Sequence, residues 1–244
     1  MAGLPAVIRQ LLHLVLPVVC TACGVRLSDD PVPFFCRTCW SRIRPLDGPM
    51  CARCGRPFPS QVALTYSPTH LCGPCRKRRP AYTQAWSLYA YAPPLQDAIR
   101  LFKYHGKVIL ATALGDLMCA ALRRAPDADV LMPVPLHPSR LREREYNQAI
   151  LLADRLNRQL GLPLSYDNLV RVRRTDPQTD LSRSARLKNL RRSFAVRRPA
   201  EVKGKRILLI DDVLTTGTTV NECAKTLRKA GAADVYVGTL ARTM

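Results

Sequence analysis

The sequence predicts a chain in two parts: a small cysteine-ligated metal domain, then an α/β domain whose mostly parallel sheet carries helices on both faces. Three observations predict this class. Eight of the ten cysteines fall before residue 76, in Cys-x-x-Cys pairs. After residue 80, strand-like and helix-like segments alternate, which is typical of a parallel sheet covered by helices. One apolar strand, residues 207–210, runs into two acids, a threonine-rich turn and a helix.

An apolar segment, residues 4–19, precedes the cysteines. Its apolar residues recur at helical spacing, which predicts an amphipathic helix packed on the rest of the protein. A secretion signal is the alternative, but the segment lacks a basic start, Arg9 and His13 interrupt it, and no small-x-small site follows. The segment is also too short to span a bilayer, so we expect no membrane insertion.

The eight cysteines form four regular pairs. Two thiolates in one tight turn is the spacing that a tetrahedral zinc ion requires. The pattern Cys-x-x-Cys-Gly occurs twice, at Gly24 and Gly55, which makes a weak internal repeat. We therefore expect two zinc ribbons in tandem, with one structural Zn²⁺ each; a crossed pairing, in which alternate pairs share an ion, stays open. The expected ligands are Cys20, Cys23, Cys36, Cys39, Cys51, Cys54, Cys72 and Cys75.

Zinc is expected to decide whether this part of the chain folds. A domain so small buries too little apolar surface to fold on its core alone. Structural zinc contributes about 10–16 kcal/mol, comparable to the whole stability of a typical domain at about 5–15 kcal/mol. Cys119 and Cys223 lie in apolar helical stretches and are expected to be buried thiols. This cysteine usage predicts a reducing compartment and hence a cytoplasmic protein.

A basic stretch, residues 76–79, and Pro80 mark the predicted boundary between a metal domain of residues 1–80 and an α/β domain of residues 81–244. The hydrophobic periodicity after this boundary predicts strands at residues 86–92, 128–134, 206–210 and 235–240. It predicts helices at residues 95–104, 108–124, 147–160 and 218–230, the last closed by Gly231.

The segment that follows the third predicted strand carries the chemistry. Asp211 and Asp212 stand where open α/β sheets bind ligands, and their carboxylates can accept hydrogen bonds from ribose hydroxyls. Gly217 lets the backbone approach a phosphate, which the amides of the next helix would face. The turn also offers the hydroxyls of Thr215, Thr216, Thr218 and Thr219. Helix capping is the alternative, but it does not require two acids and four threonines around a glycine.

Two other phosphate-binding signatures are missing from the sequence. No Gly-x-x-x-x-Gly-Lys precedes the acids, and the chain has no Gly-x-Gly-x-x-Gly. The expected ligand is therefore a ribose 5-phosphate, and neither the triphosphate of a P-loop ATPase nor a dinucleotide.

Residues 207–219, Ile-Leu-Leu-Ile-Asp-Asp-Val-Leu-Thr-Thr-Gly-Thr-Thr, resemble the ribose-phosphate motif of type I phosphoribosyltransferases. The whole chain resembles the ComF family of competence proteins, in which a double zinc ribbon often precedes such a domain. Glu145 departs from the family pattern, because it stands where the family usually has the glycine before the aromatic residue of its Arg-Gly-Phe-Asn-Gln run. If that glycine adopts a backbone conformation closed to other residues, the loop geometry should differ here. The other matching segments are residues 101–107, 133–142 and 146–148 and the spaced set Gln178, Arg186, Asn189 and Phe194.

The resemblance implies further roles. Asp211 and Asp212 would be the catalytic acids, and residues 133–142 would form a loop facing pyrophosphate, with Arg140 and Arg142 as phosphate contacts. His137 in that loop could act as a metal ligand or a general base. The favoured interpretation is that it is a hydrogen-bonded structural residue. Residues 171–198, with ten basic residues and two acids, imply a loop that closes over phosphoribosyl pyrophosphate (PRPP); a solvated basic loop is the alternative.

The resemblance also implies a function: binding of PRPP or ribose 5-phosphate in support of single-stranded DNA import during natural transformation, with a helicase partner. The alternative is an active, Mg²⁺-dependent phosphoribosyltransferase of nucleotide salvage or metabolism, whose acceptor base no residue identifies. A PRPP-sensing regulator is a third class. The net charge of +20, from 38 Lys and Arg against 18 Asp and Glu, exceeds what one such ligand offsets and favours a polyanion. A solvated basic surface is the other interpretation.

Overall fold

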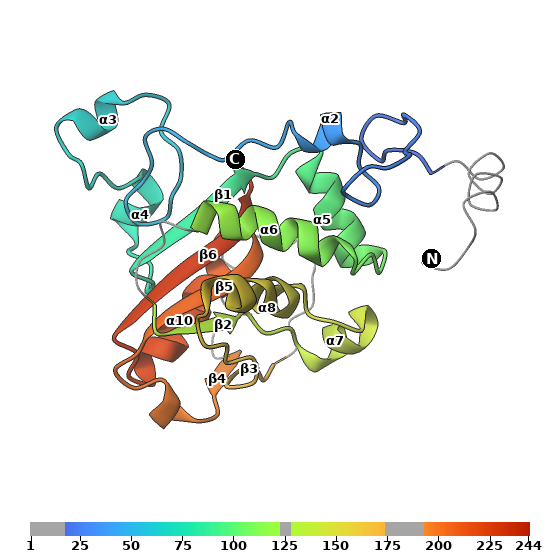
Figure 1. The fold of residues 1–244 in the computed structure, drawn as a ribbon. Coiled ribbons are helices and arrows are strands. Elements are labelled where there is room, and N and C mark those ends of the chain that lie inside the picture. Colours follow the sequence, from blue (N-terminus) through green and yellow to red (C-terminus); the bar gives the residue numbers. More distant parts are fainter. Residues whose placement is uncertain (1–17, 123–127, 174–192) are drawn as a thin grey trace. The chain divides into compact units, whose positions relative to one another are not determined.

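A computed structural model describes residues 18–122, 128–173 and 193–244 (Figure 1). The chain divides into two compact units that alternate along the sequence. The first consists of Met1–Arg44 and Ala92–Leu110, and the second of Pro45–Tyr91 and Ala111–Met244. The predicted domain boundary at residue 80 stays a prediction. The predicted N-terminal helix lies, except for Val18 and Val19, outside the described residues.

The first unit contains α2 (Arg37–Trp40) and the predicted helix α5 (Leu95–Tyr104). No side-chain hydrogen bond caps the N-terminus of helix α5. The spacing of its apolar residues explains why this segment is helical. Its buried residues recur every three or four positions on one face: Leu95, Ala98, Ile99 and Phe102.

A four-stranded sheet forms the centre of the second unit, and every neighbouring pair of strands is parallel, as predicted. Its strands, in spatial order, are β1 (Gln84–Ala90), β6 (Asp234–Arg242), β5 (Arg206–Leu214) and β2 (Val130–Pro133). Strands β5 and β6 run farther than predicted, because their backbones stay paired up to Leu214 and Arg242. Asp211 and Asp212 therefore lie within β5 and not after it.

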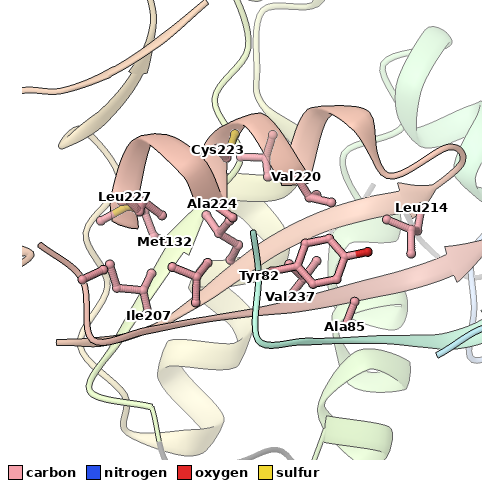
Figure 2. Close-up of a cluster of buried hydrophobic side chains, with 14 of the residues drawn as sticks. Tyr82, Ala85, Met132, Ile207, Leu214, Val220, Cys223, Ala224, Leu227 and Val237 are labelled. Atoms are coloured by element: carbon pink, nitrogen blue, oxygen red, sulfur yellow. The ribbon is translucent and has the colours of Figure 1, made fainter. Parts of the chain in front are cut away.

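Helices cover both faces of this sheet. On one face lies α10 (Thr218–Lys229), and its Val220, Ala224 and Leu227 point at the strands (Figure 2). On the other face lie α8 (Gln148–Leu160) and α6 (Leu110–Leu122). The α6 face leaves no room at Gly238, where an added Cβ would lie 3.3 Å from the Leu122 side chain. Helix α6 ends two residues before its predicted end, and residues 123–127 lie outside the described ranges.

Several short elements were not predicted, because segments this short show no hydrophobic periodicity. The antiparallel pair β3 (Leu169–Arg171) and β4 (Phe194–Val196) stands beside the main sheet as a separate two-stranded sheet. The others are α3 (Val62–Thr65), α4 (Gly73–Lys77), α7 (Pro138–Arg144) and the 3-10 helix η1 (Pro199–Glu201). Within the described ranges, no helix is both long and apolar enough to cross a bilayer.

The order of the strands positions the candidate site. Strand β2 lies beside β5, with Pro133 opposite Ile210. The chain leaves β5 into α10 on one face, whereas it leaves β2 toward α7 and α8. The carboxyl ends of two neighbouring parallel strands thus lead to opposite faces, which is where open α/β sheets bind ligands.

Candidate functional site

The two predicted acids lie in the second half of β5. Asp211 is half-buried, and Asp212 is buried, with 7% of its surface exposed. The Asp212 backbone N–H donates to Asp211 Oδ1 at 2.9 Å. Two neighbouring carboxylates at this edge offer the oxygen ligands that Mg²⁺ and ribose hydroxyls require.

The predicted threonine turn links β5 to α10. Gly217 has φ 73°, a left-handed conformation that glycine adopts freely. As the N-cap of α10, it supplies no side-chain acceptor for the first-turn amides. Thr216 Oγ1 and Thr218 Oγ1 lie 2.8 Å apart across the turn, while Thr215 is exposed and Thr219 is half-buried. The Thr218 N–H donates to Thr216 Oγ1 at 3.4 Å, so the helix presents its next first-turn N–H groups together with the threonine hydroxyls.

The segment after β2 differs from the prediction. Residues 133–142 were expected to be a loop, but α7 begins at Pro138, because a proline is favoured in the first turn of a helix. His137 caps this helix, and its Nδ1 accepts from the Ser139 backbone N–H at 3.2 Å. This contact supports the structural interpretation of His137. Arg142 is exposed on α7, with no ion pair or hydrogen bond to another described residue.

Arg171, the last residue of β3, interacts electrostatically with both Arg140 and Asp211. Burial lowers the pKa of Arg171; Cys223 and Asp211 oppose this shift, and Arg140 adds to it. The Arg171 guanidinium carbon lies 5.7 Å from the centre of the Phe194 ring. Arg171 thus places a second cation near the acids. The sequence marked it only as the first residue of a basic stretch.

Glu145 adopts a left-handed backbone conformation, which glycine favours. It ends α7 with φ 64° and ψ −15°, in the left-handed region. After it, Asn147 caps α8 by accepting from the Ala149 N–H at 3.0 Å, and its amide donates to the Val134 carbonyl at 3.1 Å. The turn between α7 and α8 is therefore fixed by the Asn147 side chain, with Glu145 in a conformation that glycine adopts freely.

The eight predicted cysteine ligands gather in two groups of four. One group is Cys20, Cys23, Cys36 and Cys39, and the other is Cys51, Cys54, Cys72 and Cys75. The ligand atoms of each group lie within 4.8 Å of one another. The sequential pairing is thus confirmed, and the crossed pairing does not occur.

The geometry of both groups fits zinc. The sulfur atoms of Cys23 and Cys36 lie 3.8 Å apart, and those of Cys54 and Cys72 lie 3.6 Å apart. Four sulfurs at about 2.3 Å from one ion are about 3.8 Å from each other. In each group a backbone N–H points at the first sulfur at 3.3 Å, from Cys36 or Cys72. These are two tetrads suited to two structural zinc ions, and Cys119 and Cys223 are buried free thiols as predicted.

The second tetrad packs on the sheet. Its four cysteines belong to the same buried cluster as Tyr82, Leu214 and the core residues of α10. The backbone N–H of Ala85, in β1, donates to the Arg53 carbonyl at 2.9 Å. Gly55 fits closely here, since an added Cβ would lie 2.7 Å from the Ala85 oxygen. The second ribbon is therefore built into the unit that holds the acids and the threonine turn.

Part of the predicted site lies outside the described residues. This holds for Gln178, Arg186 and Asn189 of the family set, and for most of the basic stretch 171–198. Phe194, the last of that set, lies in β4.

Comparison with known domain families identifies both parts of the chain. Residues 11–76 match the Double zinc ribbon domain, and residues 147–244 match the Phosphoribosyl transferase domain. The protein is therefore a double zinc ribbon joined to a phosphoribosyl transferase domain.

Whole-chain relatives define the family further. Competence protein F of Haemophilus influenzae is 34% identical over 214 residues, which cover 85% of this chain and 90% of the relative. DNA utilization protein YhgH of Escherichia coli is 33% identical over 238 residues, covering 95% and 100%. Competence protein ComFC of Bacillus subtilis is 29% identical over 245 residues, covering 93% and 95%. The chain belongs to the ComF family of these competence proteins.

Proposed function

We propose that this protein binds PRPP or ribose 5-phosphate at the end of β5. One observation carries the proposal: a pair of carboxylates and an open helix N-terminus lie at the carboxyl edge of a parallel sheet, in one continuous segment. A ribose 5-phosphate needs acceptors for its hydroxyls and donors for its phosphate, and this segment offers both. The hydroxyls would be held by Asp211 and Asp212, and the phosphate by Thr215, Thr216, Gly217, Thr218 and Thr219.

Arginines supply the other end of the proposed site. Arg140 would contact the pyrophosphate of PRPP, and Arg171, which interacts electrostatically with both Arg140 and Asp211, would support it. Arg142 remains proposed as a second phosphate contact from the exposed side of α7. Mg²⁺, when bound with PRPP, would neutralise charge on the pyrophosphate oxygens. The half-buried Asp211 carboxylate suits such an ion better than the buried Asp212 does.

The names of the relatives support a cellular role. Two are competence proteins and one is a DNA utilization protein. We therefore propose that ligand binding serves the import of single-stranded DNA during natural transformation, together with a helicase partner. Ten cysteines without a disulfide fit a reducing compartment, which favours the cytoplasm. The division into a ribbon domain of residues 1–80 and a transferase domain of residues 81–244 belongs to the same proposal.

A genetic experiment tests this role. The change Asp211→Asn removes the charge and keeps the side-chain size, so it should lower transformation frequency in a competent host to that of a strain lacking the gene. Asp154→Asn on α8 is the matched control and should leave the frequency unchanged, because its carboxylate only pairs with Arg158 on the same helix. Normal transformation in the Asp211→Asn strain would contradict the proposed role.

The second candidate is an active phosphoribosyltransferase, which the neighbourhood of Arg140, Arg171 and Asp211 favours. Arginines placed at a leaving pyrophosphate stabilise the charge that develops there. Release of pyrophosphate from PRPP, measured with a panel of purine and pyrimidine bases, separates the two candidates. Release that depends on one base, and is lost in Asp211→Asn, would establish the enzyme; binding without release would favour the binding protein or a PRPP-sensing regulator.

A further inference from the structure

A pocket lies between the threonine turn and the second cysteine tetrad, within the second unit. The turn, the segment after α4 and the end of β6 meet there. Its lining residues are Cys54, Arg56, Cys72, Pro74, Cys75, Arg78, Arg79, Pro80, Tyr82, Leu214, Thr215, Thr216, Gly217, Thr218, Asn221 and Arg242. Asp211, Asp212 and Arg140 are not among them, so the pocket adjoins the turn but does not include the acids proposed to hold the ribose.

The lining is strongly basic. Four of its residues are arginines, and none is acidic among the described residues that form it: Arg56, Arg78, Arg79 and Arg242. None of these arginines forms a salt bridge with a described residue. The open N-terminus of α10, a helix of twelve residues, adds partial positive charge at the same place. Apart from the cysteine thiolates of the second tetrad, the described residues of the lining therefore offer these arginines no negative partner.

Arg242 is the informative residue in this lining. It ends β6 opposite Leu214, and only 3% of its surface is exposed. Its Nη1 donates to the Cys54 carbonyl at 2.7 Å, but its Nε is buried without a hydrogen-bond partner. A buried charged donor left without an acceptor is strongly unfavourable. Tyr82 lies beside it, with its hydroxyl directed toward Leu214 (Figure 2), and adds a further polar group to the pocket.

We propose that this pocket binds a phosphate group, with Arg242 as its buried anchor and Arg78 and Arg79 at its rim. The second zinc ribbon then completes the phosphate end of the ligand site, and the inference rests on the proposed function only in sharing the Thr215–Thr218 turn. A phosphate offers the several acceptor oxygens that guanidinium groups and helix amides require together. Two sources share this chemistry: the monoester of a phosphoribosyl ligand and the phosphodiester of single-stranded DNA.

The arginines have one competing explanation, which is charge balance at the metal centre. Zinc and four thiolates carry a net charge of about −2. Four guanidinium groups exceed this by two positive charges, so balance alone leaves a surplus beside the turn. Zinc content must therefore be measured together with affinity.

The experiment titrates the full, zinc-loaded chain with ribose 5-phosphate, PRPP and a deoxythymidine oligomer without a terminal phosphate. Arg242→Lys keeps the charge but removes the Nε–H and the planar guanidinium, and the exposed Arg79→Gln cannot disturb the core. Arg158→Gln, on the exposed face of α8, is the matched control. We expect Arg79→Gln and Arg242→Lys each to lower the affinity for ribose 5-phosphate about tenfold or more, because each removes a charge-assisted hydrogen bond to the phosphate. The affinity of the Arg158→Gln control should equal that of the wild type, and the zinc content should be the same in all variants.

The outcomes separate this inference from the proposed function. Unchanged affinity in Arg79→Gln and Arg242→Lys, with PRPP binding still lost in Asp211→Asn, overturns the pocket and leaves the proposed function. Arginine-dependent binding of ribose 5-phosphate that Asp211→Asn does not affect supports the pocket and contradicts the ribose site. Zinc loss in Arg79→Gln overturns the pocket in favour of charge balance. Competition by the oligomer identifies the phosphodiester as the source, and its absence identifies the monoester.

Discussion

Two residues hold left-handed backbone conformations with opposite consequences. Glu145 ends α7 at φ 64°, and Gly217 opens α10 at φ 73°. This region costs a residue with a Cβ about 1–2 kcal/mol, whereas glycine enters it freely. The strain at Glu145 and the freedom at Gly217 lead to two predictions of opposite sign.

Glu145→Gly should stabilise the protein. Removal of the strain outweighs the greater entropy of glycine in the unfolded chain, which costs about 0.4–1 kcal/mol, and leaves a gain of up to about 1.6 kcal/mol. Urea denaturation of the zinc-loaded protein measures this gain. Glu145→Ala is the control and should gain nothing, because alanine keeps the Cβ. A destabilised Glu145→Gly protein would show that the side chain makes a contact that matters more than the strain.

Gly217→Ala should have the opposite effect. An added Cβ meets no close atom, since its nearest neighbours, Leu214 Cδ1 and the Tyr82 hydroxyl, would lie 3.7 and 3.8 Å away. The loss of about 1–2 kcal/mol therefore comes from the torsion alone. Because the same torsion aims the amides of the turn, binding of ribose 5-phosphate should weaken as well. Full stability in urea, with unaltered binding, would mean that the turn does not depend on glycine.

At the residue scale, the sequence revealed the groups that follow one another along the chain. Asp211, Asp212 and the threonines could be predicted because strand, acids, turn and helix are consecutive. Arg171 and Arg242 could not, since the fold brings them to the site from distant strands. The position of Arg242, a charge at the end of an apolar strand near the predicted ligand edge, was the one available signal.

At the scale of elements, the two tetrads have different surroundings. The first contains the exposed Cys23 and belongs to the first unit, whereas all four cysteines of the second are buried in the cluster that includes the sheet. The main chain of the second ribbon also pairs with Ala85 and accepts from Arg242. The second ion should therefore stabilise the transferase domain directly.

Paired substitutions test this difference. Wild-type protein should hold two zinc ions, and both Cys23→Ser with Cys36→Ser and Cys54→Ser with Cys72→Ser should hold one. Only Cys54→Ser with Cys72→Ser should lower the melting temperature of the sheet and the affinity for ribose 5-phosphate, because this pair disrupts the buried cluster. Zinc analysis and circular dichroism measure the two effects. Equal melting temperatures for the two variants would contradict a structural role of the second ion in this domain.

Long elements could be predicted and short ones could not. Helices α5, α8 and α10 begin within a residue of their predicted starts, because their apolar faces repeat over several turns. Helix α7 and the β3–β4 pair are too short to carry such a pattern. The prediction of a loop over residues 133–142 was wrong from Pro138 onward for this reason, and it affected the part of the site that holds Arg140.

At the scale of the whole molecule, the net charge of +20 is larger than one phosphoribosyl ligand offsets. If the basic stretch 171–198 and residues 76–79 contact single-stranded DNA, affinity should fall steeply with salt. Each phosphate contact contributes a slope of about −0.7 on a log–log plot, so four or five contacts give about −3. Fluorescence anisotropy with a labelled oligomer measures this slope.

A double substitution identifies the surface responsible. Arg191→Ala with Arg192→Ala, at positions outside the described residues, should flatten the salt dependence of DNA binding without changing the affinity for ribose 5-phosphate. Arg158→Ala with Lys229→Ala removes the same charge from α8 and α10 and should leave the slope unchanged. A flat salt dependence in the wild-type protein would mean that the basic residues form a solvated surface.

The central claim is that the acids of β5 and the turn before α10 bind a phosphoribosyl ligand. Calorimetric titration of the zinc-loaded protein with PRPP and Mg²⁺ tests it most directly. We predict saturable binding by the wild-type protein and none by Asp211→Ala with Asp212→Ala, whose zinc content and circular dichroism should match the wild type. Because Asp212 is buried, the single change Asp211→Asn serves as a check that the loss does not come from unfolding. Equal affinity in the wild type and in both variants would contradict the account.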